Sequence, residues 1–502
     1  MIPLRLGSQE CFASVRAFLE DAGYTESEVC RRLGVEAQHE VMGRPDLKPV
    51  SETGDATDLL LRLFLAGGRA EDGELRRHVP EAVLESMRAL GLLERDEPDS
   101  SPWRAPVCLY SIGPLYIVSD RWTNADGSPF APAPDIVYPA LTKNTYRFLS
   151  LIPREPCRRL LELCSGAGAA ALTAASGYAC EAWAVDITER STHFAEFNRR
   201  LNGLANVKAL QGDLYQPLQG LKFDRIVAHP PYVPAASRSL IFQDAGEEGE
   251  EITRAIVAGL AEHLEPGGAL YCLTLGADHR GEPLEKRVRG WIGAQQEAFD
   301  VMVAAVEGHT AEQVASKPLL KGQIGHREFA VRRAAFTESG IEQFVYGLIV
   351  VERIADAGRP AFTIRRQMGT RTGSAECGWA LRWEAVAASR GSEAILLAAK
   401  PRRSGNLELS VIHRMQDGEL APQEFTLQAG YPFRMECKVH PWTVALLEAC
   451  DGFRSGAQLH AHCRQQGWIH EEVAAGEFAR FLGTLVSGGF LEVEGFEPPG
   501  AS

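Results

Sequence analysis

Short apolar runs alternate with amphipathic, helix-period stretches between residues 157 and 351. Five of these runs have the length and composition of buried strands: residues 158–164, 180–187, 207–213, 223–229 and 268–275. Each of them ends in a polar residue or a turn. This alternation predicts an α/β, Rossmann-like domain with a doubly wound, mostly parallel sheet, in which ligands bind beyond the carboxyl ends of the strands.

Other parts of the chain have different patterns. Two late apolar runs, 298–308 and 342–353, predict an antiparallel hairpin at the edge of the sheet. Residues 51–96 have the pattern of three short helices followed by the start of a wing at 91–96, and residues 440–494 that of helix, turn, helix and strand. The expected domains are an N-terminal winged-helix-like module (1–100), a linker or lid (101–143), the sheet domain (144–353), a strand-containing region of unassigned fold (354–433) and a C-terminal winged-helix-like module (434–502).

Composition narrows the classes of function. The chain has 502 residues and a formal net charge of −14, which opposes coating by nucleic acid. Its 11 cysteines never form a CxxC pair, so neither a disulfide framework nor a structural zinc site is expected, and no other metal site is predicted. With no apolar run long enough to span a bilayer, we expect a cytoplasmic protein that has no membrane partner.

Candidate chemistry begins at residues 162–168, Glu-Leu-Cys-Ser-Gly-Ala-Gly, which close the first strand. Gly166, Gly168 and Ala171, with Asp186 twenty residues after Gly166, also satisfy the dinucleotide pattern of NAD-binding proteins. The carboxylate of Glu162 would oppose a pyrophosphate but attract a cationic ligand such as S-adenosylmethionine. A tight turn without any ligand is the simplest alternative, and Asp186 would then be only a helix N-cap.

Two further segments favour the cationic ligand, because an NAD enzyme has no need of them. Asp213 and Leu214 end the third strand, and Ala-His-Pro-Pro-Tyr at 228–232 ends the fourth. The motifs LLELCSGAGAAAL, VDITERS, GDLYQPL and FDRIVAHPPYVP, in this order and spacing, resemble class I S-adenosylmethionine-dependent methyltransferases, and among them the HemK/PrmC type that methylates glutamine side chains. The resemblance covers roughly residues 144–275, about a quarter of the chain.

The resemblance implies S-adenosylmethionine as the cofactor and assigns residues to it. The loop 162–168 would hold the methionine part, Asp186 the ribose hydroxyls, and Asp213 with Leu214 the adenine. A cysteine stands at position 164, where the family has a glycine. The cofactor-binding residues expected from the resemblance are Glu162, Cys164, Ser165, Gly166, Gly168, Asp186, Asp213, Leu214 and His229.

The acceptor loop departs from the family at one position. The family has Asn-Pro-Pro-Tyr, where the asparagine and a backbone carbonyl bind a planar NH2 group; here His229 precedes Pro230, Pro231 and Tyr232. These four residues are the expected substrate-binding residues, and His229 and Tyr232 the expected catalytic ones. His229 would be a general base, with a rate that rises through about pH 6 to 7, or an orienting group, or a residue that only closes the loop.

The predicted function is transfer of a methyl group from S-adenosylmethionine to a nitrogen or oxygen of a protein, peptide or peptide-like substrate. Alternatives are a small-molecule natural-product methyltransferase, an N6-adenine nucleic-acid methyltransferase and a non-catalytic peptide-binding module. Both winged-helix-like modules carry more acidic than basic residues, which favours protein contact over nucleic acid. The C-terminal one is similar to PqqD-like peptide-recognition domains. The N-terminal one would suit a homodimer interface.

Overall fold

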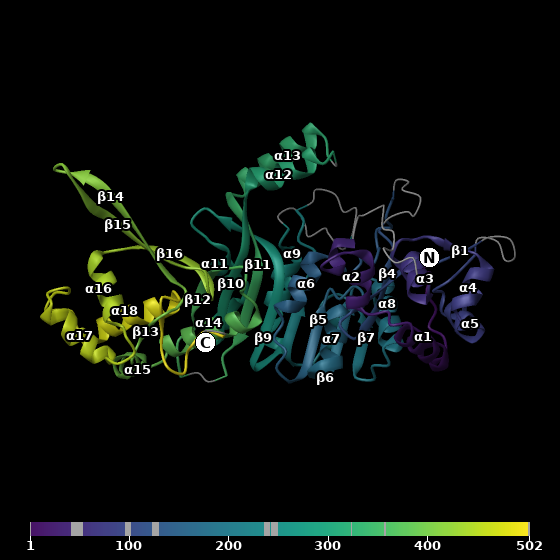
Figure 1. Cartoon of the computed structure of the whole chain (residues 1–502), viewed down its shortest axis with the longest axis horizontal. Helices are drawn as coiled ribbons and strands as arrows, with labels where there is room; N and C mark the ends of the chain where they lie inside the picture. Colours follow the sequence, from purple (N-terminus) through teal and green to yellow (C-terminus); the bar gives the residue numbers. More distant parts are fainter. Residues whose placement is uncertain are drawn as a thin grey trace. The chain divides into compact units, whose positions relative to one another are not determined.

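The computed structural model describes residues 2–41, 54–95, 102–122, 130–234, 241, 249–322, 324–355 and 358–499. The chain forms two compact units, Met1–Leu275 and Gly276–Ser502 (Figure 1). Among the described residues, none of the helices combines the length and the apolarity that crossing a membrane requires.

The first unit contains the predicted parallel sheet. Its strand order is β9-β8-β5-β6-β7, and every neighbouring pair is parallel. The strands are β5 (Cys157–Leu163), β6 (Ala179–Asp186), β7 (Val207–Gln211), β8 (Phe223–Ala228) and β9 (Leu264–His279). Each of them overlaps one of the five apolar runs, so the prediction of a doubly wound sheet is confirmed.

Helices cover this sheet because parallel strands need long crossover connections. The helix α7 (Ala169–Gly177) packs on β5 and β6, and α8 (Glu189–Leu201) packs on β6 and β7. Leu160, Leu161 and Ile226 are completely buried, as expected for strands that are covered on both faces. The other helical elements of this domain are α6 (Lys143–Ser150), η3 (Gln216–Leu218), α9 (Glu251–Ala258) and α10 (Leu260–His263).

The N-terminal part of this unit is mainly helical. Its elements are α1 (Gln9–Asp21), α2 (Glu26–Leu33), η1 (Gln38–Val41), α3 (Ala56–Leu60), η2 (Leu61–Leu65), β1 (Arg69–Ala70), α4 (Asp72–His78), α5 (Glu81–Leu90) and β2 (Trp103–Arg104). β1 pairs with β2, and Glu94 and Arg104 exchange two backbone hydrogen bonds of 3.0 Å. This order agrees with the winged-helix expectation, which stays a prediction because the segment that follows the expected start of the wing at 91–96 lies outside the described residues.

An antiparallel hairpin lies in the region expected as a linker. It consists of β3 (Val107–Ile112) and β4 (Leu115–Asp120). Asn198 of α8 and Asn202, the residue that caps this helix at its C-terminus, hold β4. The Oδ1 atom of Asn198 accepts from the Val118 amide at 2.8 Å, and that of Asn202 from the Tyr116 amide at 2.9 Å. The hairpin is therefore fixed to the helix that follows β6.

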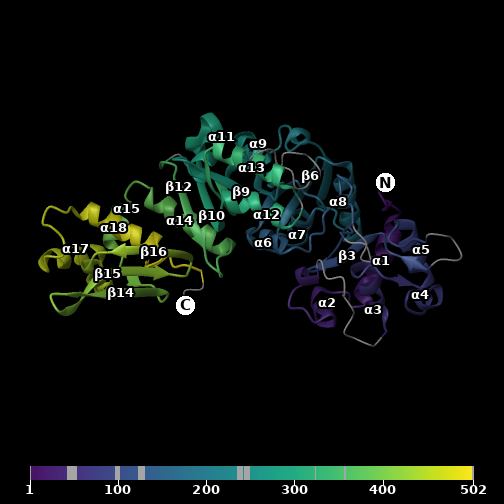
Figure 2. The same cartoon turned by 90° about the horizontal axis from the view of Figure 1, so that it is seen from above.

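The second unit has a mixed sheet with the order β14-β15-β16-β12-β10-β11. Its sheet strands are β10 (Phe299–Thr310), β11 (Ile341–Arg353), β12 (Thr363–Met368), β14 (Leu407–Gln416), β15 (Glu419–Ala429) and β16 (Phe433–Val439). β10 and β11 pair antiparallel, as predicted, but the expectation that they form an edge hairpin is wrong, because β12 joins β10 in parallel and extends the sheet beyond it. The chain between β10 and β11 forms two helices that pack together, α12 (Ala311–Leu320) and α13 (His326–Glu338) (Figures 1 and 2).

The region of unassigned fold shares one core with the C-terminal helices. Leu427 of β15 and Trp383 of α14 belong to the same buried cluster as Leu446, Phe478 and Leu482. The remaining elements of this unit are α11 (Leu284–Ile292), η4 (Gly293–Ala298), α14 (Ser374–Ala387), α15 (Ser392–Ala398), β13 (Arg402–Arg403), α16 (Pro441–Ala449), α17 (Gly456–Gln465), α18 (Ala475–Ser487) and β17 (Leu491–Glu492). β13 pairs with β17.

Candidate functional site

A cavity of about 890 Å³ lies in the first unit, where β5, β6 and β8 end. Such a position beyond the carboxyl ends of parallel strands is where open α/β sheets bind ligands. The predicted site residues that line it are Glu162, Cys164, Ser165, Gly166, Asp186, Asp213, Leu214, His229, Pro230, Pro231 and Tyr232. Of the predicted set, Gly168 alone is not part of this lining.

The loop after β5 has an unusual backbone. Cys164, Gly166 and Gly168 have positive φ angles of 54°, 51° and 80°. A Cβ atom on Gly168 would lie 3.2 Å from the Cβ of Ala195, so this glycine permits close packing against α8, whereas a Cβ on Gly166 would meet nothing within 4 Å. The glycine found at position 164 in the family is thus explained by the left-handed backbone, which Cys164 adopts at a steric cost.

Glu162 is a buried carboxylate at the end of β5. It accepts hydrogen bonds from the amides of Ala170 at 3.2 Å and Ala171 at 2.8 Å, at the start of α7. Burial raises its pKa to about 7, the two backbone hydrogen bonds oppose this shift, and the negative charge of Asp186 adds to it. Glu162 therefore stabilises the helix start and sits close to its protonation midpoint at neutral pH.

Asp186, the last residue of β6, connects two parts of the cavity wall. Its Oδ2 atom accepts from the Gly166 amide at 2.9 Å, and its Oδ1 atom accepts from the amide and hydroxyl of Thr188 at 3.1 Å each. The N-cap of α8 is Thr188, whose side chain accepts from the Ser191 amide. The alternative that Asp186 is merely a helix N-cap is therefore wrong.

The turn after β7 brings Asp213 and Leu214 to the same cavity. Leu214 has a positive φ of 48°, and Asp213 is exposed. The amide of Gly212 donates to the backbone oxygen of Asp186 at 2.9 Å, which fixes this turn next to the end of β6.

His229 is enclosed by two aromatic rings. Its ring centroid lies 5.4 Å from that of Phe148 and 5.7 Å from that of Tyr232. Its Nε2 atom is buried and has no hydrogen-bond partner among the residues that the structure describes. Burial lowers the pKa of His229 to about 4, so the imidazole is neutral at pH 7.

The sequence patterns did not identify three residues that organise this site. Asn144 donates from Nδ2 to the hydroxyl of Tyr232 at 3.1 Å, and Phe148, one turn later on α6, packs on His229. From α8, Asn198 donates to the carbonyl oxygens of Val118 and Ala167, each at 3.0 Å. The sequence feature that could have indicated α6 is the Thr-x-x-Thr pattern at 142–145, which marks a helix start. In the structure the Thr142 side chain accepts from the Thr145 amide.

The fold and the site define the class of this domain. Residues 140–291 match the family described as "Methyltransferase small domain". This match confirms the predicted resemblance for that part of the chain, and with it a methyltransferase domain of the class that uses S-adenosylmethionine.

Relatives with assigned names are similar to the same part. The release factor glutamine methyltransferase of Moorella thermoacetica is 35% identical over 154 residues, covering 28% of this chain and 53% of the relative. The ribosomal protein uL3 glutamine methyltransferase of Bradyrhizobium diazoefficiens is 35% identical over 127 residues, covering 23% and 40%. The chain spans about half the length of the first curated relatives it matches.

A solved structure, a methyltransferase from Pyrococcus furiosus, aligns with 18% identity and a TM-score of 0.27 over 42% of this chain and 82% of that chain. A score this low supports no inference about the present chain.

Proposed function

We propose that this chain transfers a methyl group from S-adenosylmethionine to a nitrogen or oxygen atom of a protein or peptide. The observation that carries the proposal is the single cavity of about 890 Å³, because the loop after β5, the end of β6 and the His229–Tyr232 segment all line it. A cofactor and an acceptor held in one such cavity would have their reacting atoms in contact.

The residues present suit the cofactor. Open space at Gly166 leaves room for a ligand against the loop backbone, and Asp186 ends the strand at which a ribose would bind. We assign the methionine part to residues 162–168, the ribose to Asp186, and the adenine to Asp213 and Leu214. When bound, S-adenosylmethionine supplies an electrophilic methyl group on a sulfonium.

For the acceptor, we propose that His229 orients the reacting group and does not remove its proton. Three observations support this role: its Nε2 is buried and without a partner among the described residues, its ring is held between Phe148 and Tyr232, and its pKa is far below neutral. A neutral imidazole has one donor and one acceptor nitrogen, and the Nε2 of His229 is the one that has no partner among the described residues. Pro230 and Pro231 stiffen the backbone that presents it.

A side-chain amide is the acceptor that we favour within this class. The names of the two relatives given above specify glutamine in a release factor and in a ribosomal protein. A planar amide would fit beside Tyr232, and an N–H of the amide would satisfy the Nε2 of His229. The same proposal includes protein-binding roles for both flanking modules. The N-terminal winged-helix-like module would support dimerisation, and the C-terminal PqqD-like module would bind a protein or peptide. It also includes a cytoplasmic location.

The experiment is incubation of the purified chain with methyl-labelled S-adenosylmethionine and a cell lysate, followed by mass spectrometry of the labelled products. We expect label in one or a few proteins, on a glutamine side chain. Asp186→Asn should abolish labelling, and Asp21→Asn, on the exposed end of α1, should leave it unchanged. Label found only in nucleic acid, or only in small metabolites, would contradict the proposal and favour the corresponding alternative.

A further inference from the structure

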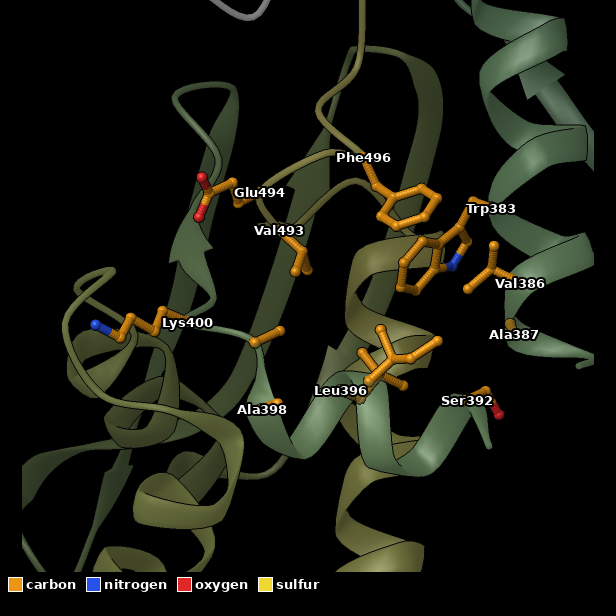
Figure 3. Close-up of a pocket in the computed structure, with 12 residues that line it drawn as sticks. Trp383, Val386, Ala387, Ser392, Leu396, Ala398, Lys400, Val493, Glu494 and Phe496 are labelled. Carbon is orange, nitrogen blue, oxygen red and sulfur yellow. The ribbon is translucent and has the colours of Figure 1, made fainter. Parts of the chain in front are cut away.

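The second unit has two surface features at which another molecule could bind. One is a cavity of about 410 Å³, formed by the end of α14, by α15 and by the chain after β17 (Figure 3). The charged residues of its lining, Lys400 and Glu494, are exposed, so the cavity itself specifies no particular ligand. The other feature is the outer edge of the sheet at β14, where backbone, apolar and charged groups together specify a partner.

The strand β14 forms that outer edge. It pairs with β15 on one side, and none of the described strands pairs with it on the other. In Figures 1 and 2 the hairpin of β14 and β15 extends beyond the helices of its unit, with β14 on the outer side. Such an edge presents a row of backbone N–H and C=O groups to any strand that can align with it.

This edge lacks the proline, the bulge and the short length that commonly keep a sheet edge from pairing. The strand is ten residues long and contains neither proline nor glycine. The bulge of the hairpin adds its extra residue, Gln423, to β15 and not to β14. β14 is therefore a regular strand that can accept a neighbour over most of its length.

One face of β14 is apolar and partly uncovered. Because side chains alternate along a strand, this face carries Leu407, Leu409, Val411, His413 and Met415. Leu409 is 42% exposed and Met415 66%. A strand beside β14 would bring its own side chains against this row, and such cross-strand pairs stabilise sheets. The face thus favours a partner strand with apolar residues at alternate positions.

The opposite face carries charges of both signs. Glu408 and Arg414 lie on it, three residues to either side of Val411. Glu408 is exposed and has no ion-pair partner in the described part of the chain. Arg414 contacts Glu424 at 2.7 Å, but the Nζ of Lys438 contacts the same carboxylate at 2.6 Å. This group of three therefore keeps a net positive charge, while Glu408 keeps a negative one.

We propose that β14 pairs antiparallel with β14 of a second copy of this chain, about a two-fold axis at Val411. In this register Glu408 of each copy lies opposite Arg414 of the other, so two ion pairs form between the chains. On the apolar face, Leu407 of each copy lies opposite Met415 of the other. The same strand thus supplies both halves of the interface.

The charges select this register among those that keep the apolar face on one side. An axis at Ser410 would place Glu408 opposite Ile412, and an axis at Ile412 would place it opposite Gln416. Neither gives Glu408 a cation. The pairing concerns the second unit alone and does not rest on the proposed methyl transfer.

The test is sedimentation velocity of the full chain over a series of concentrations. We expect the unmodified chain to associate into dimers. Glu408→Arg brings like charges together at both pairs, and so does Arg414→Glu, so each should weaken association roughly tenfold or more. The chain with both substitutions has the charges exchanged and should associate within about threefold of the unmodified chain.

Mixing the two single variants provides the sharpest comparison. A Glu408→Arg chain and an Arg414→Glu chain have complementary charges at both pairs, so an equal mixture should associate more tightly than either variant alone. This result also shows that both variants are folded. Glu419→Arg, exposed on β15 of the same hairpin, is the matched control and should associate like the unmodified chain.

Two results would overturn the inference. A chain that stays monomeric up to its solubility limit does not pair through β14, and its edge would then be open to a strand of another protein. Dimers that are unaffected by either charge reversal, or variants that do not associate more tightly when mixed, would show that association uses another surface, such as the N-terminal module.

Discussion

Asn144 donates a hydrogen bond to the hydroxyl of Tyr232 across 88 positions of sequence, at 3.1 Å. Asn144 stands in the first turn of α6, and Phe148, one turn later on the same helix, packs on His229. A single short helix therefore holds both aromatic residues of the predicted acceptor loop. Because Tyr232 and His229 also stack on each other, a change at α6 should affect the acceptor more than the cofactor.

Asn144→Ala tests this arrangement. Loss of the hydrogen bond frees the Tyr232 ring, so we expect kcat/KM for the acceptor to fall about tenfold, with binding of S-adenosylhomocysteine unchanged. Initial rates at varied acceptor concentration and calorimetric titration measure the two quantities. Lys143→Ala, an exposed neighbour on α6, is the matched control. Equal losses in acceptor and cofactor binding would show that α6 supports the whole cavity.

Asp186→Asn tests the cofactor half. A carboxamide has one oxygen where the carboxylate has two, so the variant loses the charge and can no longer accept hydrogen bonds from both Gly166 and Thr188 as Asp186 does. We expect affinity for S-adenosylhomocysteine to fall more than tenfold, while circular dichroism stays that of the unmodified chain. Asp21→Asn serves as the control. Heat released on adding NAD or NADH, with none on adding S-adenosylhomocysteine, would end the methyltransferase interpretation.

The central parallel strands were predictable because they are buried on both faces and so read as apolar runs, as at Leu160 and Leu161 of β5, whereas only Val207 of the edge strand β7 is buried. The site residues at the strand ends followed from that topology. Asn144 and Phe148 were not predictable, because their roles depend on the packing of α6 against a loop far away in sequence. The region 354–433 was hard to assign because β14 and much of β15 are exposed, so their alternating residues do not indicate which core they belong to.

Cys164 offers a test of the local backbone. Its left-handed conformation, with φ of 54°, disfavours any side chain, and glycine removes that cost. We expect Cys164→Gly to have a free energy of unfolding about 1 kcal/mol higher than that of Cys164→Ala, which keeps the strain without the thiol. Urea unfolding followed by fluorescence measures the difference. If the alanine variant is as stable as the glycine variant, the left-handed backbone conformation at position 164 has no energetic cost for a small side chain.

His229 gives two predictions, and the first uses its protonation to separate the proposed orienting role from general-base catalysis. A base with an ordinary pKa would make the rate rise through about pH 6 to 7. With its pKa lowered to about 4 by burial, His229 is already neutral there, so it should contribute no rise in rate across that interval. Any change that titration of Glu162, with its pKa near 7, produces there should also appear in the His229→Asn variant. His229→Asn, which restores the residue of the family, should keep or raise activity and leave the pH profile unchanged. A sharp loss of rate in this variant would restore the general-base role.

The same shift affects stability, and its sign follows from proton binding. Between about pH 6.5 and 4 the unfolded chain binds a proton at His229 that the folded chain does not, so the folded state loses stability as the pH falls through this window. His229→Asn has no such group. The unmodified chain should therefore lose up to about 3 kcal/mol relative to the variant between these limits, measured by urea unfolding at several pH values. If the free energies of unfolding of the two chains change with pH in parallel, His229 titrates near its ordinary pKa. An imidazole that acts as a base would then make the rate of the unmodified enzyme rise between pH 6 and 7.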